Sequence, residues 1–165
     1  ELQASIIQKK KEGFLGVYEV NRLTNYCGKW IYNCGWYPDH KIRIFPKDQC
    51  YWEGAYVHES LFIPQDLKKH SLSGHLLHYS YYSFEEHKER ADHYSTLTAK
   101  KMQAQGRKAS VLKPYLSGLI RFLSMYLLKK GFLDGKMGWK IARISAASNI
   151  FKYKELRRLN HEQTN

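Results

Sequence analysis

The strongest candidate for acid–base chemistry is the pair His58-Glu59, which follows a predicted strand over residues 50–57. A carboxylate beside an imidazole at the end of a strand can accept a proton from a substrate hydroxyl group. The same two residues also suit an ordinary solvated surface, and their spacing alone favours that alternative. The sequence contains no HExxH, no GxSxG and no phosphate-binding P-loop. From the residues alone, Glu59 is a candidate base, and no reaction is established.

Metal-ligating residues are not grouped along the sequence. His75 and His78 are three residues apart, which on a strand places them on opposite faces of the sheet. Cys27, Cys34 and Cys50 form no CxxC pair, which argues against a zinc knuckle, and their odd number fits a reducing compartment. No two aspartates are separated by a single residue, so we expect no DxD-type metal site in the chain itself.

Aromatic residues are dense between residues 30 and 56. The group is Trp30, Trp36, Tyr37, Tyr51, Trp52 and Tyr56, with Asp39, Arg43 and Glu59 along the same stretch. Rings flanked by single charges suit sugars, whose C–H faces stack on aromatic rings while carboxylates bind the hydroxyl groups. The alternative is that these rings form the core, as aromatic residues on strands usually do. The sequence leaves both interpretations open.

The positive charge is concentrated in the C-terminal third of the chain. The net charge is +12; residues 1–98 carry 12 Lys and Arg against 12 Asp and Glu, whereas residues 99–165 carry 15 against 3. Such a segment can bind phosphate groups, either in nucleic acid or at an anionic membrane surface. The alternative is a solvated helical surface that happens to be basic.

Residues 115–128 form a strongly apolar stretch that ends at Lys129-Lys130. Its apolar residues cover most of a helical circumference: Leu116, Leu119, Ile120, Phe122, Leu123, Tyr126 and Leu127. The stretch is too short to span a bilayer and too apolar for a freely exposed helix. It is therefore either the central helix of a bundle or an interfacial helix in the headgroup layer.

Strands precede helices along the chain. Strands are predicted over residues 16–23, 29–33, 41–45, 50–57 and 74–79, and helices over 2–11, 83–106, 115–128 and 137–159. Ser83 and Glu86 form a capping box, and Pro114 suits a first helical turn. The pattern predicts an α+β fold of short strands followed by about three C-terminal helices, divided into residues 1–82 and 83–165.

Several segments, taken in order, resemble a known family. They are Arg22, Gly35-Trp36-Tyr37-Pro38-Asp39, Arg43-Ile44-Phe45, Val57-His58-Glu59, Leu76-Leu77-His78-Tyr79-Ser80-Tyr81 and Gly131-Phe132-Leu133-Asp134-Gly135. From about residue 14 to 156 the chain resembles the acceptor half of a family 2 glycosyltransferase, more narrowly the lipopolysaccharide-core β-glucosyltransferase type. The resemblance implies a GT-A fold, of whose sheet the short strands would be a remnant.

The resemblance implies inverting transfer of a sugar from a nucleotide-sugar donor to a lipid-linked saccharide acceptor, with Glu59 as the catalytic base. Arg43 would pair with a phosphate group, and Trp36 and Asp39 would hold a sugar ring. The remaining expected substrate-binding residues are His58, His78 and Arg22. A divalent metal, Mg²⁺ or Mn²⁺, is expected in the full-length enzyme through a DxD motif that this chain lacks and that would precede Glu1, so the isolated chain is expected to be inactive.

The expected location is cytoplasmic, peripheral on the inner face of the cell membrane, because a lipid-linked acceptor would explain the basic and apolar region 83–165. The expected partners are the donor, the acceptor and an anionic membrane surface, with no nucleic acid. The alternative to an enzyme is a non-catalytic basic module that docks on a membrane or binds nucleic acid.

Overall fold

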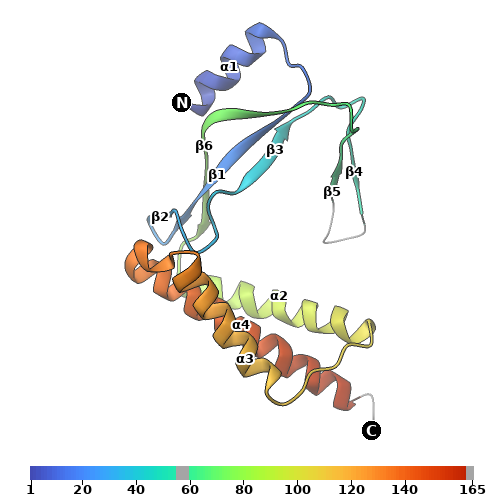
Figure 1. Cartoon of the computed structure of the whole chain (residues 1–165), viewed down its shortest axis with the longest axis vertical. Helices are drawn as coiled ribbons and strands as arrows, with labels where there is room; N and C mark the ends of the chain where they lie inside the picture. Colours follow the sequence, from blue (N-terminus) through green and yellow to red (C-terminus); the bar gives the residue numbers. More distant parts are fainter. Residues whose placement is uncertain (55–59, 163–165) are drawn as a thin grey trace. The chain divides into compact units, whose positions relative to one another are not determined.

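The computed structural model describes residues 1–54 and 60–162, and it has a mixed α+β fold in which antiparallel strands precede C-terminal helices (Figure 1). The predicted α+β class is therefore confirmed. The chain divides into two compact units, residues 1–23 with 38–78 and residues 24–37 with 79–165. The predicted division between residues 82 and 83 follows the change from strands to helices, whereas these units follow contacts between residues.

The first unit is built around strand β1 (Val17–Tyr26), which pairs antiparallel with β3 (His40–Ile44) and also pairs with β6 (Lys69–Tyr81). The last residues of β1 and β6 belong to the second unit. Tyr18 pairs with Ile44 and Asn21 with His40, with a register shift after Tyr18. β1 and β6 are longer than the predicted strands 16–23 and 74–79, whereas β3 has the length of the predicted strand 41–45 and begins one residue earlier.

Helix α1 (Leu2–Glu12) covers one small core of this unit. Leu2 and Ile6 pack on a cluster whose buried residues are Tyr18, Val20 and Leu72. Gly74 on β6 makes room for the start of the helix, because a Cβ there would lie 2.4 Å from the backbone nitrogen of Leu2. The predicted helix over residues 2–11 is confirmed and is one residue longer.

A separate two-stranded sheet completes the first unit. β4 (Tyr51–Glu53) pairs antiparallel with β5 (Ser60–Phe62), with Trp52 opposite Leu61. β4 begins the predicted strand 50–57, of which residues 55–57 lie outside the described residues. β5 was not predicted, because three residues are too few to show an alternating pattern.

The second unit is mainly helical. Besides the short strand β2 (Lys29–Ile31), which pairs with the end of β1, it contains α2 (Phe84–Ala104), α3 (Lys113–Leu123), a π-helical turn η1 (Ser124–Leu128), a 3₁₀ turn η2 (Gly131–Asp134) and α4 (Gly135–Glu162). The hydroxyl group of Ser83 accepts a hydrogen bond from the Glu86 amide at 3.0 Å, as the capping box predicts. The apolar stretch 115–128 is therefore an α-helix followed by a π-turn.

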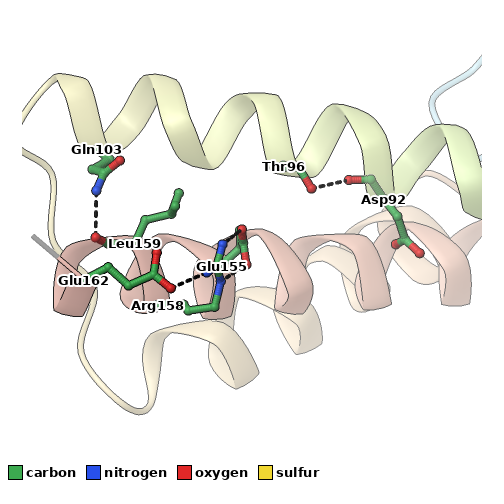
Figure 2. A network of polar contacts seen from close by, with 7 residues as sticks. All are labelled: Asp92, Thr96, Gln103, Glu155, Arg158, Leu159 and Glu162. Atoms are coloured by element: carbon green, nitrogen blue, oxygen red, sulfur yellow. Dashed lines mark hydrogen bonds and ion pairs between the residues drawn. The ribbon is translucent and has the colours of Figure 1, made fainter.

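Helix α4 packs against both α2 and α3. One core joins it to the end of β1 and includes Tyr26, Ile31 and Met125, and another joins it to α2 through Ala99, Met102 and Leu156. At the far end of α2, Gln103 donates a hydrogen bond to the carbonyl oxygen of Leu159 at 2.7 Å (Figure 2). The long helix α4 is thus the element that holds the other two helices.

Candidate functional site

An ion pair joins two of the predicted binding residues, Arg22 on β1 and Asp39 immediately before β3. The guanidinium Nε and Nη2 atoms of Arg22 lie 2.7 and 2.6 Å from Oδ2 of Asp39. The Arg22 amide also donates to the Asp39 carbonyl oxygen at 2.8 Å, which continues the antiparallel pairing. Residues 17 positions apart are therefore brought together by the sheet, as a shared binding site requires.

Asp39 is held ionised by a second cation. The ammonium group of Lys41 lies 2.9 Å from Oδ1, so each carboxylate oxygen has its own cationic partner. Burial raises the pKa of Asp39, but hydrogen bonds from Lys41 and Arg22 outweigh it and leave the pKa below its ordinary value. A carboxylate stabilised in this way is a weak base, so Asp39 is suited to positioning rather than to proton abstraction.

Glu19, on β1, is the other carboxylate of this sheet that is held by cations. Its oxygens lie 2.6 Å from Nζ of Lys69 and 3.3 Å from Nδ1 of His40, and it accepts a hydrogen bond from Ser71. The hydrogen bond from Lys69 is the main cause of a pKa below the ordinary value. Neither of these two carboxylates is thus poised to accept a proton at neutral pH.

Arg43 and His78 lie in the same unit, on β3 and β6. Arg43 is exposed, and its described hydrogen bond runs from Nη1 to the neighbouring carbonyl oxygen of Ile42 at 2.9 Å. Its guanidinium group therefore keeps donors directed to solvent, as binding a phosphate group requires. His78 is half-buried on β6.

Trp36 belongs to the second unit, where its ring is half-buried among core aromatic residues. It packs edge-on against Tyr26 at 5.5 Å and also contacts Tyr81 and His87. This packing favours a structural role for Trp36 over sugar stacking. Within the cluster, Tyr26 Oη and His87 Nδ1 are 2.8 Å apart, and burial lowers the pKa of His87 to about 4.

The hairpin β4–β5 presents aromatic rings to solvent. Tyr51 and Trp52 are 55% and 57% exposed, and Phe62 is 38% exposed. Tyr51 stacks on Phe62 across the hairpin at 4.7 Å, and Trp52 meets Phe45 edge-on at 6.4 Å, just after β3. The alternative that the aromatic residues form the core is therefore wrong for Tyr51 and Trp52. Their exposed rings form a surface on which a sugar can stack. Phe62 was not among the predicted sugar-stacking residues, because β5 was not predicted.

His58 and Glu59 lie outside the described residues, so their assigned roles stay predictions. Chain connectivity places them in the segment that joins β4 to β5, between Glu53 and Ser60. Both strands that flank this segment carry the exposed rings.

Two further observations bear on the site. Within residues 1–54 and 60–162, no three His, Cys, Asp or Glu side chains are grouped as metal ligands. A cavity of about 370 Å³ lies elsewhere, between α2 and α4, where Phe84, Lys88 and Lys140 contribute to its walls and none of the predicted site residues does. The aromatic hairpin and the charged strands of the first unit are therefore the better candidate.

No protein-family model matches the chain, and no solved structure matches it significantly. Among the helices of the described part of the chain, none combines the length and the apolar character needed to cross a membrane.

Proposed function

We propose that the chain is the acceptor-side part of an inverting family 2 glycosyltransferase, which transfers a sugar from a nucleotide-sugar to a lipid-linked saccharide in lipopolysaccharide-core or other cell-envelope polysaccharide synthesis. The observation that carries the proposal is the exposed aromatic hairpin on both sides of His58-Glu59. Large aromatic side chains normally bury most of their surface, so solvent-facing rings indicate a ligand with apolar faces, such as a sugar.

The charged residues of the same unit support a division of roles. Asp39 and Glu19 are held ionised by cations, so neither is suited to accept the proton, and the family resemblance assigns that role to Glu59. Arg43 keeps exposed guanidinium donors that match the fork geometry of a phosphate group. In this assignment the pair Arg22–Asp39 orders the start of β3 and presents a carboxylate to sugar hydroxyl groups.

The proposed reaction is a single displacement. Glu59 accepts the proton of the acceptor hydroxyl group while the oxygen of that hydroxyl group attacks the anomeric carbon of the donor sugar. The bond between the anomeric carbon and the nucleoside diphosphate breaks, and its electron pair stays on the phosphate oxygen. The divalent metal, Mg²⁺ or Mn²⁺, would neutralise the leaving diphosphate and belongs to a DxD motif that this chain does not contain. A lipid-linked acceptor places the proposed enzyme at the inner face of the cell membrane.

Saccharide binding by the 165-residue chain tests the proposal directly. Titration with a deacylated lipopolysaccharide-core oligosaccharide, followed by calorimetry, should show binding that Trp52→Ala weakens by about 10-fold or more, since stacking energy is lost. Trp139→Ala is the matched control, because Trp139 is another exposed tryptophan but lies in the second unit. Absence of binding to the unmodified chain, or equal weakening by both substitutions, would contradict the proposal.

The second candidate function is a non-catalytic basic module. Exposed aliphatic residues on α3 favour a membrane over nucleic acid as its partner, because single-stranded nucleic acid is bound by basic grooves with stacking aromatic rings. Catalysis by a protein that contains this chain, abolished by Glu59→Gln, would distinguish the enzyme from such a module.

A further inference from the structure

Helix α3 packs on α4 through its small residues instead of its leucines. Pro114 and Gly118 are its buried residues. A Cβ on Gly118 would lie 2.4 Å from Cγ1 of Ile150 and 3.2 Å from the carbonyl oxygen of Ala146, so the two helix backbones approach closely at this point. A larger residue at position 118 would overlap the Ile150 side chain, so either that side chain or the two helices would have to move.

Polar contacts hold α3 in this orientation. The side-chain amide of Asn149 on α4 donates to the hydroxyl group of Ser117 at 2.8 Å and to its carbonyl oxygen at 3.3 Å. One π-turn later, Met125 is almost fully buried. Ser117, Gly118 and Met125 thus lie on the side of α3 and its π-turn that packs against the rest of the unit. The opposite side of α3 therefore points outward.

The outward face is aliphatic. We define the α3 apolar face as Leu116, Leu119, Ile120, Leu123, Leu127 and Leu128, whose exposed fractions range from 41% to 81%. On a helix these positions lie together on one side, continued into the π-turn. Single exposed leucines are ordinary, but a contiguous row of this size indicates a surface that is covered in use.

Aromatic and basic residues adjoin this face. Phe132 and Trp139 are 47% and 44% exposed, and Leu133 beside them is 61% exposed. Tyr126, Lys136 and Trp139 contribute to the walls of a shallow cavity of about 300 Å³. Tryptophan and tyrosine beside lysine are the residues that concentrate at the headgroup level of a bilayer.

The surrounding charge is positive and uncompensated. Between residues 113 and 154 the chain carries nine Lys and Arg, and its one acid, Asp134, is buried and accepts hydrogen bonds from the amides of Tyr32 and Asn33. No carboxylate in the described residues forms an ion pair with any of the nine. Burial, together with Arg121, Arg107 and Lys113, lowers the pKa of Lys152, as expected where cations repel one another.

The far end of α4 differs in this respect. Arg158 forms a two-pronged contact with Glu155, at 2.7 and 2.9 Å, and is also paired with Glu162 (Figure 2). Residues 113–154, which include the α3 apolar face, therefore carry eight of the twelve excess positive charges; residues 99–112 carry the other four, and residues 155–165 carry none.

We propose that the α3 apolar face docks into the headgroup layer of an anionic lipid leaflet. The aliphatic side chains would enter the acyl boundary, while Trp139 and the lysines remain among the lipid phosphates. Charge argues against a second copy of this chain, since a symmetric pair would bring like-charged surfaces together. The inference rests on the second unit alone and holds whether or not the protein transfers a sugar.

Vesicle co-sedimentation of the 165-residue chain tests this docking. We expect binding to vesicles of equimolar phosphatidylcholine and phosphatidylglycerol at 0.1 M salt and little binding to phosphatidylcholine alone. Binding should weaken at 1 M salt, because the Debye length falls from about 10 Å to about 3 Å. Lack of binding to the anionic vesicles at 0.1 M salt would overturn the proposal.

Two matched pairs of variants locate the surface. Leu123→Ser should weaken binding by about 10-fold, whereas Leu97→Ser on α2 should not, although Leu97 and Leu123 are 40% and 41% exposed. Lys130→Gln with Lys136→Gln should weaken binding by about 10-fold or more, and Lys10→Gln with Lys11→Gln on α1 should have little effect. Equal losses within either pair would overturn the assignment of the surface.

The fluorescence of Trp139 gives a readout that a folding defect would not reproduce. Vesicle binding should shift the emission to shorter wavelength, and Trp139→Phe should remove most of that shift while the chain still co-sediments. If the chain instead sediments as a dimer in solution and ignores vesicles, the face is a self-association surface. If the chain stays monomeric and does not bind vesicles, the face does not bind lipid, and either result rejects lipid docking.

Discussion

The two compact units differ in how their charges are paired and in which apolar residues they expose. The first carries 9 Lys and Arg against 8 Asp and Glu, and its half-buried carboxylates are paired: Asp39 with Arg22 and Lys41, and Glu19 with Lys69. The second carries 18 Lys and Arg against 7 Asp and Glu, with a long basic segment that has no acidic partner in the described residues. Paired charges order a strand, whereas unpaired charges remain available to an external anion.

The exposed apolar residues differ in the same sense. In the first unit they include the rings of the β4–β5 hairpin, which offer flat faces beside hydrogen-bonding groups. In the second they include the aliphatic row on α3, beside lysines. The first combination suits a sugar and the second suits a lipid, so the contrast separates a candidate site of chemistry from a candidate site of attachment.

The largest expected effect concerns Glu59 in the first unit. In a protein that joins this chain to a nucleotide-binding half, as the proposed function requires, Glu59→Gln should lower turnover by about 10²- to 10⁴-fold with nearly unchanged donor binding, because only the proton acceptor is lost. Steady-state kinetics and donor titration measure both quantities. Glu53→Gln, an exposed carboxylate at the end of β4, is the control, and wild-type turnover in Glu59→Gln would remove the proposed chemistry from this unit.

In the second unit, a larger residue at the close approach of α3 and α4 should be strongly destabilising. Gly118→Val should lower the free energy of unfolding by about 3 kcal/mol, since its Cβ would overlap Ile150. Denaturant unfolding measures the change. Ala147→Val, at an exposed position on α4, should cost less than about 1 kcal/mol. A mild effect of Gly118→Val would mean that α3 can turn its leucines inward, which would end the contrast.

His87 should make the stability of the second unit sensitive to acid. Its pKa is about 4 in the folded protein and near 6.5 when unfolded, so below pH 6.5 the unfolded chain binds a proton that the native chain does not. The stabilisation is complete above pH 6.5 and is lost progressively towards pH 4; by pH 5 the loss is about 2 kcal/mol.

Thermal or denaturant unfolding of wild-type protein and of His87→Phe, at pH 8 and at pH 5, checks this expectation. The variant should lose less stability between the two pH values than the wild-type protein, even if it is less stable at both. An identical pH dependence in the two proteins would show that another group is responsible.

The smallest effect is expected from Arg43 in the first unit. Arg43→Lys should weaken binding of the donor or acceptor phosphate by about 10-fold, because a compact ammonium group cannot form two parallel hydrogen bonds. The Michaelis constants of both substrates report it, with Arg90→Lys on α2 as the control. Unchanged constants for both substrates would leave Arg43 without a substrate role.

Local features were largely predictable from the sequence. The capping box at Ser83 placed the start of α2, and the β-forming residues around Val17–Val20 placed β1. These signals depend on contacts between near neighbours, which propensity and capping describe well. The concentration of positive charge in residues 99–165 was also predictable, because it depends only on the order of residues in the sequence.

Long-range partners were not predictable. Arg22 and Asp39 are 17 residues apart, and only the pairing of β1 with β3 joins them. Trp36 was assigned to a sugar because of its neighbours in the sequence, yet its ring packs against Tyr26, Tyr81 and His87. Which aromatic rings are inside and which are outside depends on how the strands and helices meet.

The apolar stretch 115–128 shows the same division most clearly. Its composition established a helix too short to cross a membrane and too apolar to be freely exposed, and it left a core helix and an interfacial helix equally open. The tertiary structure placed the leucines outward, because Gly118 and Ser117 fit against Ile150 and Asn149 at a backbone distance that leucine side chains would prevent. Periodicity shows that a helix has two faces, but the shape of the neighbouring helix decides which of them is buried.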